Sequence, residues 1–323
     1  MNSLLHSAVV SVLPTLLGTK NTQRLSILNY HRVLPEPDFM RMALPTVSEF
    51  EWQMELLAQH FNPLPLSEAL SLMDYGELPE RAVCVTFDDG YADNQALALP
   101  VLQRLGVPAT IYVATGYLDG GRMWNDTIVE AMRIASKKKV DLSAIGLGIH
   151  NINGQDDRRK AAASIISEVK HWPPAKREAA IQYIAAIEMN GELPTNLMLT
   201  TEQLKGLSDS GVDIGAHTTT HPILATLELS EARKEILGSK DELESIIGKT
   251  VDNFAYPNGR PEIDYHVEHR DLAELAGYKS AVSTQWGVAA KTSDRWQLPR
   301  FTPWDKTPSR FLVRLLLNYR DPV

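Results

Sequence analysis

Short apolar runs of strand length alternate with helix-like segments along most of this chain, and this alternation restricts the possible folds more than any other feature. Between the runs, apolar residues recur at the three- and four-residue spacing of a helix face. Strands separated by helices return to the same edge of a sheet and pair in parallel. We therefore expect an α/β fold, a closed barrel of about seven mostly parallel strands, with an open doubly wound sheet as the alternative. The expected strands cover residues 25–30, 82–87, 108–114, 212–216, 253–256, 280–283 and 297–301.

Residues from about 120 to 199 interrupt the alternation. This stretch is rich in Ala, Lys, Glu and Ile, and we expect helices over 127–138, 158–171 and 174–188. We interpret it as a helical insertion within a main domain that spans residues 25–323. Its composition leaves open whether the insertion covers a cleft or binds a partner.

The overall charge limits the partners that the chain can have. Its 323 residues include 40 Asp and Glu against 32 Lys and Arg, which gives a formal net charge of −8. A surface that binds nucleic acid needs an excess of basic side chains, so no nucleic acid partner is expected. Cys84 is the single cysteine, which excludes an intrachain disulfide, and its apolar neighbours indicate a buried side chain. Nothing in the sequence indicates an oligomeric state.

We expect the first 24 residues to form an N-terminal amphipathic helix or arm ahead of the main domain. Residues 1–18 contain no Lys or Arg, which a secretory signal needs at its start, and Pro14 interrupts the apolar run. The run is also shorter than the roughly 20 residues of a membrane-spanning helix. We expect an amphipathic helix that packs on the domain or contacts a membrane surface, and hence a cytoplasmic or membrane-peripheral protein without a cleaved signal peptide.

Three polar clusters coincide with the ends of expected strands. Asp88 and Asp89 follow the second strand, His217 and His221 follow the fourth, and Tyr256 ends the fifth at the start of a Tyr-Pro-Asn-Gly sequence. The carboxyl ends of parallel strands meet on one face of an α/β fold, and ligand sites are built there. We therefore expect the three clusters to form one site.

Two histidines and one carboxylate at such a site can hold a divalent cation. His217 and His221 are four residues apart, and Asp88 or Asp89 can supply the carboxylate. Two imidazoles and a carboxylate leave one coordination position open for water, as in catalytic zinc sites. Considered separately, the histidines could be a core or capping pair and the two aspartates a polar turn. Their shared position at strand ends favours the metal site.

The clusters lie within motifs that follow one another in a recognisable order. Residues 86–91 read TFDDGY, residues 217–222 read HTTTHP and residues 254–259 read FAYPNG. They resemble the motifs of the polysaccharide deacetylases, the NodB-like carbohydrate esterase family 4. Residues 28–33 (LNYHRV) and 298–300 (LPR) are similar to the branch of that family linked to bacterial exopolysaccharide synthesis. The resemblance covers most of residues 25–301.

This resemblance implies a metal-dependent N-deacetylase built on a distorted (β/α) barrel. Asp88 matches the general base, and Asp89, His217 and His221 match the three metal ligands. The backbone N–H of Asn258 matches the donor that stabilises the tetrahedral oxyanion. The implied cofactor is one divalent metal ion, with zinc preferred and cobalt or nickel as alternatives for the same ligands.

Two positions differ from the family pattern. Ala255 stands where the family usually has the Arg that orients the base. We predict that Arg300, at the end of a late strand, takes over this role and lies within hydrogen-bonding distance of Asp88, with Arg32 and Arg260 as alternatives.

The second difference concerns the acid that protonates the leaving amine. The family usually has a C-terminal Leu-x-His for this step, and here no histidine follows His269. By position His31 is the candidate for the acid. Its alternative role is a hydrogen bond to Asp88 or to the backbone.

Four aromatic side chains near the motifs are candidates for substrate binding, because aromatic faces can pack against the apolar faces of sugar rings. Core packing is the alternative for any one of them. Trp304 could also contact a sugar, with the same alternative of core packing. The candidates are Tyr91, Tyr256, Trp124 and Trp286.

Together these features predict a hydrolase that removes the N-acetyl group from an amino sugar in a bacterial surface polysaccharide or its lipid-linked precursor. A deformylase, or another amide hydrolase that acts on a lipid-linked sugar, is an alternative with similar chemistry. A catalytically weak, carbohydrate-binding assembly subunit is an alternative of another class. The two departures from the family pattern favour this last alternative, and the intact aspartates and histidines oppose it.

Overall fold

Eight strands form the main sheet in the computed structural model, which describes residues 23–187, 189–320 and 322–323. They are β1 (Arg24–Tyr30), β2 (Asn62–Pro63), β3 (Ala82–Phe87), β4 (Ala109–Val113), β7 (Asp213–Ala216), β8 (Asn253–Ala255), β9 (Ser280–Val282) and β10 (Ala289–Ala290). The sheet order is β10-β1-β3-β4-β7-β8-β9, with β2 also paired to β3. Seven strands run parallel and β10 runs antiparallel to β1, which confirms the predicted parallel sheet.

The segment from Leu298 to Phe301 closes the sheet into a distorted barrel. Leu298 bridges to Val282 of β9, and Phe301 bridges to Leu28 of β1. Backbone hydrogen bonds flank both bridges. The strand expected over residues 297–301 is thus two separate bridges, because its ends pair with different strands. The observed fold is the closed barrel and not the open doubly wound sheet.

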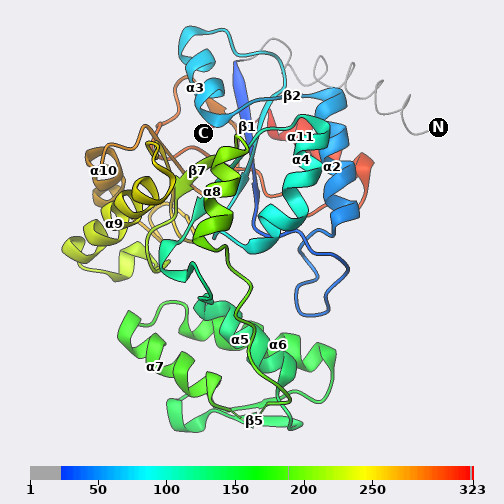
Figure 1. The fold of residues 1–323 in the computed structure, drawn as a ribbon, viewed down its shortest axis with the longest axis vertical. Helices are drawn as coiled ribbons and strands as arrows, with labels where there is room; N and C mark the ends of the chain where they lie inside the picture. Colours follow the sequence, from blue (N-terminus) through cyan, green and yellow to red (C-terminus); the bar gives the residue numbers. More distant parts are fainter. Residues whose placement is uncertain (1–22, 188, 321) are drawn as a thin grey trace.

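Helices lie around the outside of the barrel (Figure 1). In the first of them, Thr46 and Glu49 exchange capping hydrogen bonds, and the apolar periodicity buries Phe50, Met54 and Leu57. The helical segment over residues 94–105 begins with a π-helical turn at Asn94–Ala98. Pro100 lacks the N–H that a regular helix would need at the junction. The helices are α2 (Val47–His60), α3 (Leu66–Tyr75), α4 (Leu99–Leu105), α8 (Thr201–Asp209), α9 (Leu229–Ile247), α10 (Val267–Leu275) and α11 (Pro308–Asn318).

The predicted insertion lies between β4 and β7 and forms the lobe below the barrel in Figure 1. Its three helices pack around a separate apolar cluster, which includes Ile128, Met132 and Ile165 and also Met40 from the segment before α2. The sequence pattern does not predict the hairpin beside them, because each of its strands has only three residues. The elements are α5 (Trp124–Ile134), β5 (Lys139–Asp141), β6 (Ile149–Asn151), α6 (Gln155–Val169) and α7 (Pro174–Ala185).

None of the described helices combines the length and the apolar character that a membrane-spanning helix needs. The amphipathic helix predicted within residues 1–18 lies outside the described residues.

Candidate active site

The polar clusters lie at the carboxyl ends of neighbouring parallel strands. Asp88 and Asp89 follow β3, His217 follows β7, and Asn258 lies three residues beyond β8. β4 pairs with both β3 and β7, and β7 pairs with β8, so these strand ends share one edge. Arg300 reaches the same edge from the segment that closes the barrel. The fold thus brings together the residues that the sequence assigns to one site.

Asp89, His217 and His221 form a cluster that can hold a cation. Their ligand atoms lie within 4.8 Å of one another, and Oδ1 of Asp89 is 3.4 Å from Nε2 of each histidine. Two ligand atoms about 2.0–2.1 Å from a zinc ion at the tetrahedral angle would be roughly 3.4 Å apart, so this spacing fits such an ion. Oδ1 of Asp89 is also buried without a hydrogen-bond partner among the described residues, and a bound cation would supply one.

Backbone groups orient the two histidine rings. Nδ1–H of His217 donates to the Ala255 carbonyl at 2.7 Å, which leaves the lone pair of Nε2 free for a metal. The backbone N–H of His221 donates to Oγ1 of Thr218 at 3.1 Å. The loop between the histidines is held by Glu235 of α9, which accepts the backbone N–H groups of residues 219 and 220 at 2.9 and 2.8 Å. The sequence gives no signal for Glu235, because it is one of many charged residues on that helix.

Four residues of the site adopt left-handed backbone conformations. Their φ angles are 77° at Asp89, 63° at Thr218, 52° at His221 and 59° at Asn258. A non-glycine residue in such a conformation costs of order 1–3 kcal/mol and is found mainly where function requires it. The strain therefore points to the same residues as the ligand geometry.

Burial and charge set the protonation states of the cluster. Burial alone would raise the pKa of Asp89, but the His217 ring and the charges of His221 and His31 hold it well below its usual value. Burial lowers the pKa of His221 to about 3, so this ring is neutral at pH 7. Burial also lowers the pKa of His217, but Asp89 and Asp88 outweigh it and raise the value overall. The two carboxylates thus favour positive charge at this position, and a bound cation would supply it.

Arg300 holds Asp88 through a two-armed ion pair inside the barrel. Nη1 and Nη2 of Arg300 each donate to one carboxylate oxygen of Asp88 at 2.7 Å, and Nε donates to the Ser283 carbonyl at 2.8 Å. Burial would raise the pKa of Asp88, but the charge and the hydrogen bonds of Arg300, together with His217, lower it. The predicted contact between Arg300 and Asp88 is confirmed.

The two alternatives for this arginine have other partners. Arg32 forms an ion pair with Asp93 at 2.7 Å, and Arg260 forms one with Asp264 at 2.9 Å. Neither guanidinium is therefore the partner of Asp88.

Asn258 and His31 lie next to this cluster. The Asn258 carbonyl accepts the Thr284 hydroxyl at 2.7 Å, and among the described residues its backbone N–H has no acceptor. His31 follows β1, is half-buried, and its charge helps to lower the pKa of both Asp88 and Asp89. Within the described chain its ring forms no hydrogen bond, so the alternative bond to Asp88 or to the backbone is not observed.

Three of the four aromatic candidates are core residues, which corrects the prediction that they bind substrate. Tyr91 is 2% exposed and donates its hydroxyl to Asp126, and Tyr256 is fully buried against Tyr265, with ring centroids 3.7 Å apart. Trp124 packs in the apolar cluster of the insertion. Burial of an aromatic ring excludes it from contact with a sugar, so core packing is the correct interpretation for all three.

Trp286 differs because it is 38% exposed. Its ring packs against Phe301 and Trp304, with centroid distances of 4.8 and 5.5 Å. The guanidinium of Arg314 lies over the same group and is 3.8 Å from the Trp304 ring centroid. Trp286 lies three residues after Ser283, and Phe301 follows Arg300, so the aromatic group is close in the sequence to residues of the site.

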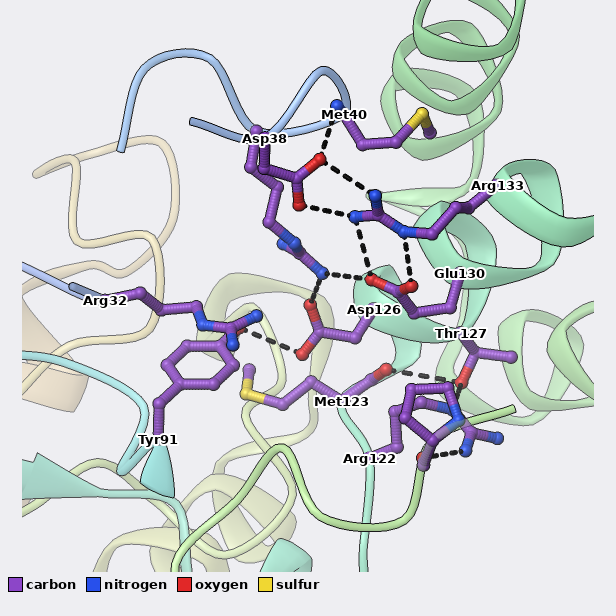
Figure 2. Close-up of polar contacts among 12 residues, drawn as sticks. Arg32, Asp38, Met40, Tyr91, Arg122, Met123, Asp126, Thr127, Glu130 and Arg133 are labelled. Atoms are coloured by element: carbon purple, nitrogen blue, oxygen red, sulfur yellow. Dashed lines mark hydrogen bonds and ion pairs between the residues drawn. The ribbon is translucent and has the colours of Figure 1, made fainter. Parts of the chain in front are cut away.

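A partly buried ionic network joins α5 of the insertion to the segment that precedes α2 (Figure 2). Asp126 of α5 accepts hydrogen bonds from Arg41 and from the hydroxyl of Tyr91, which lies two residues after Asp89. Asp38, Glu130 and Arg133 extend the network, in which Nη1 and Nη2 of Arg133 donate to Asp38 at 2.8 and 2.6 Å. We call residues 38, 41, 126, 130 and 133 the latch. The sequence does not predict the latch, because its members lie about 90 residues apart in two segments without a motif.

A family model supports the resemblance described above. The model for polysaccharide deacetylases matches residues 75–281 of the chain. This region contains the two aspartates, the two histidines and the insertion.

The individual proteins that are similar to this chain share only a modest part of its sequence. A Bacillus subtilis protein named as a candidate polysaccharide deacetylase, YxkH, is 25% identical over 284 residues, which is 87% of this chain and 72% of that protein. A poly-beta-1,6-N-acetyl-D-glucosamine N-deacetylase of Staphylococcus epidermidis is 30% identical over 127 residues, or 35% of this chain and 42% of that enzyme. The structure of the Streptococcus pyogenes deacetylase PplD in complex with acetate aligns with a TM-score of 0.61 at 20% identity, covering 91% of this chain and 98% of PplD. That structure shares the fold.

Proposed function

The chain belongs to the polysaccharide deacetylase family, and from this premise we propose that it hydrolyses the N-acetyl group of an amino sugar in a surface polysaccharide or its lipid-linked precursor. The observation that carries the proposal is the arrangement of an ionised, arginine-held carboxylate, Asp88, beside a cluster with the spacing of metal ligands. A carboxylate base next to a metal centre is one combination that hydrolyses amides at neutral pH.

Asp89, His217 and His221 would hold one divalent cation, for which we propose zinc, since one carboxylate and two imidazoles suit it. When bound, such an ion supplies polarisation of the acetyl carbonyl and a lower pKa for the attacking water.

The side chains of this chain account for the proton transfers. Asp88 accepts a proton from the attacking water while the water oxygen bonds to the acetyl carbon. Arg300 keeps both carboxylate oxygens of Asp88 in place. The N–H of Asn258 is free to donate to the developing oxyanion. His31 then gives a proton to the sugar nitrogen as the C–N bond breaks, which releases acetate and a free amine.

Trp286 and Trp304 are proposed to support the sugar chain at the border of the site. Both rings are partly exposed, at 38% and 56%, and they pack together with Phe301 and Arg314 beneath them. An exposed aromatic pair of this kind offers an apolar surface of the size of a sugar ring.

Acetate release from a neutral chitooligosaccharide, measured together with the metal content of the purified protein, tests the proposal. We expect one equivalent of metal per chain and acetate release that stops on chelation and returns with zinc. The variant Asp88→Asn should retain the metal and lose most of the activity, which separates catalysis from contamination. A wild-type protein that binds metal but releases no acetate from any N-acetylated sugar would contradict the proposal.

A further inference from the structure

The segment that leads into the insertion holds the loop between the two candidate histidine ligands. The backbone N–H of Gly116 donates to the Thr219 carbonyl at 2.8 Å. The hydroxyl of Tyr117 donates to the Thr220 carbonyl at 2.9 Å. The chain therefore enters the insertion directly from contacts with the histidine loop.

The segment that leads out of the insertion holds the loop that carries Asp89. The backbone N–H of Leu199 donates to the carbonyl of Gly90 at 2.9 Å. Next to this bond, Met198 forms an antiparallel bridge with Tyr91. The two ends of the insertion are thus attached to the two loops that supply the candidate metal ligands.

Asp89 depends on these neighbours for its position. The φ angles of Asp89 and Gly90 are 77° and 82°, so two successive residues lie in the left-handed region, which a non-glycine residue rarely adopts. The ligand atom Oδ1 of Asp89 is buried and has no hydrogen-bond partner among the described residues. The direction of this atom is therefore set by the backbone of residues 89–91.

The side chain of Tyr91 anchors this backbone to the insertion. It is 2% exposed and packs with Met123 and Met198 in a small apolar cluster. The guanidinium of Arg32 lies 4.7 Å from the centroid of the Tyr91 ring. The ring is therefore confined, and its hydroxyl donates to Asp126 of α5 at 3.0 Å (Figure 2).

Asp126 is itself held in place by the latch. Its side chain is fully buried, and its two oxygens have different partners: Oδ2 accepts the Tyr91 hydroxyl and Oδ1 accepts an N–H of Arg41. Arg41 also donates to Glu130, one turn further along α5, at 3.2 Å. The carboxyl group of Asp126 cannot turn without losing one of its partners, so the Tyr91 hydroxyl has an acceptor in a fixed place.

We propose that Tyr91 and Asp126 are positioning residues, through which the insertion places Asp89 at the distance from His217 and His221 that a divalent cation requires. That distance is 3.4 Å from Oδ1 of Asp89 to Nε2 of each histidine. The proposal rests on the metal-dependent function proposed above. Residues that orient a metal ligand from outside the coordination sphere are known to set metal affinity. The insertion thereby acquires a role in the metal site itself.

The metal affinity of the full chain tests the proposal, with Tyr91→Phe as the main variant. This substitution removes the hydroxyl and keeps the ring, so the apolar packing of the side chain is preserved. The dissociation constant for zinc is measured by competition with a chromophoric chelator. The visible absorption of the cobalt-loaded protein reports the coordination geometry of the ion, and the melting temperature of the metal-free protein reports the stability of the fold.

Tyr278→Phe is the matched control. Tyr278 is also 2% exposed, and its hydroxyl donates to the Ile236 carbonyl at 2.9 Å, so the control loses a buried hydrogen bond of the same kind. Tyr278 precedes β9 and lies at the amino end of that strand, whereas the candidate site lies at the carboxyl ends. Two further variants change the acceptor: Asp126→Ala removes the partner of the Tyr91 hydroxyl, and Asp126→Asn retains one.

We expect Tyr91→Phe to raise the zinc dissociation constant roughly 10-fold, the lower end of the range for residues that orient a ligand, because Tyr91 acts through the backbone. Its cobalt spectrum should differ from that of the wild type, whereas Tyr278→Phe should match the wild type in both measurements. Both Phe variants should lower the melting temperature of the metal-free protein by similar amounts.

The acceptor variants should follow the same hydrogen bond. We expect Asp126→Ala to weaken zinc binding as Tyr91→Phe does, and Asp126→Asn to stay close to the wild type. Adding Tyr91→Phe to Asp126→Ala should have little further effect on zinc affinity, because both substitutions remove one shared interaction.

Two results would overturn the positioning role. One is wild-type zinc affinity and an unchanged cobalt spectrum in Tyr91→Phe, which would limit the hydrogen bond to the stability of the fold. The other is an equal loss of zinc affinity in Tyr278→Phe, which would trace the effect to general destabilisation.

Failure of the proposed function gives a different result. A wild type that binds zinc but releases no acetate from chitooligosaccharide would refute the deacetylase, while the zinc dissociation constants still decide whether Tyr91 positions Asp89. A wild type that binds no divalent metal would refute both.

Discussion

Arg300 and Asp88 form a buried, two-armed ion pair with both N–H···O distances at 2.7 Å. Arg300 lies in the segment that bridges β9 and β1, so the same four residues close the barrel and deliver the guanidinium. Its Nε is bound to the Ser283 carbonyl, which fixes the plane of the group. The orientation of the proposed base therefore depends on barrel closure, whereas the family usually places this arginine where Ala255 stands here.

Replacing Arg300 with Lys should impair catalysis more than metal binding. An ammonium group keeps the charge but cannot make two parallel hydrogen bonds to Asp88, so the carboxylate is free to turn toward the metal. We expect kcat/KM to fall roughly 10–100-fold, in line with the loss of a charge-assisted hydrogen bond, at unchanged zinc content. Acetate release and metal analysis of the purified variant measure both. Wild-type activity in Arg300→Lys would show that Asp88 needs no such restraint.

Replacing Asp88 with Asn should abolish the proton acceptor and preserve the shape of the site. The expected decrease in kcat is roughly 10²–10⁴-fold, the usual contribution of a positioned base. Zinc should remain bound at one equivalent, because Asp88 is not among the three clustered ligands. A variant that loses zinc together with activity would instead identify Asp88 as a ligand.

Replacing His221 with Ala should remove most of the affinity for metal. Its Nε2 is one of the two imidazole nitrogens 3.4 Å from Oδ1 of Asp89. Loss of a residue that only hydrogen-bonds to a metal ligand raises the dissociation constant of the metal roughly 10–100-fold. We expect a larger rise in the zinc dissociation constant here, because a ligand itself is removed. His171→Ala, which alters an exposed residue of the insertion, serves as the control. Unchanged zinc affinity in His221→Ala would refute the ligand assignment.

Gly116 leaves room for the loop between His217 and His221. Its N–H donates to the Thr219 carbonyl at 2.8 Å, and a Cβ at this position would lie 2.8 Å from the same oxygen. Gly116→Ala must therefore displace residues 218–221, and we expect weaker zinc binding and a loss of stability of roughly 1–3 kcal/mol. Gly154→Ala is the control, because its Cβ would meet no atom within 4 Å. Equal zinc affinity in the two variants would show that the loop adapts without loss.

The sequence predicts those parts of the site that depend only on where the strands end. Apolar runs followed by polar residues locate β3, β7 and β8 and the side chains at their ends, because strand position alone decides where these residues meet. The contact of Arg300 with Asp88 follows from the same reasoning.

Features that depend on tertiary packing could not be predicted in this way. Tyr91 and Tyr256 follow or end a strand like true site residues, and only the packing of Asp126 and Tyr265 against them shows that they are buried. Arg177 lies in a helix whose composition is ordinary. Its position over the ring of Trp124 becomes visible only when α7 is packed against α5.

The latch predicts a specific loss of stability in acid. Burial alone would raise the pKa of Asp38, but its hydrogen bonds from Arg133 and from the Met40 N–H, with the charges of Arg133 and Arg41, lower it. The unfolded chain, in which the pKa of an aspartate is about 3.9, therefore binds the proton more tightly than the folded protein. The stabilisation is complete above about pH 4 and is lost as the pH falls through the lower folded value. The free energy of unfolding is measured with urea at several pH values between about 5 and 3. It should decline more steeply for the wild type than for Asp38→Asn. Asp209→Asn, which alters an exposed position, should behave as the wild type. Parallel declines in all three proteins would mean that the Asp38–Arg133 pair contributes nothing to the acid sensitivity of the fold.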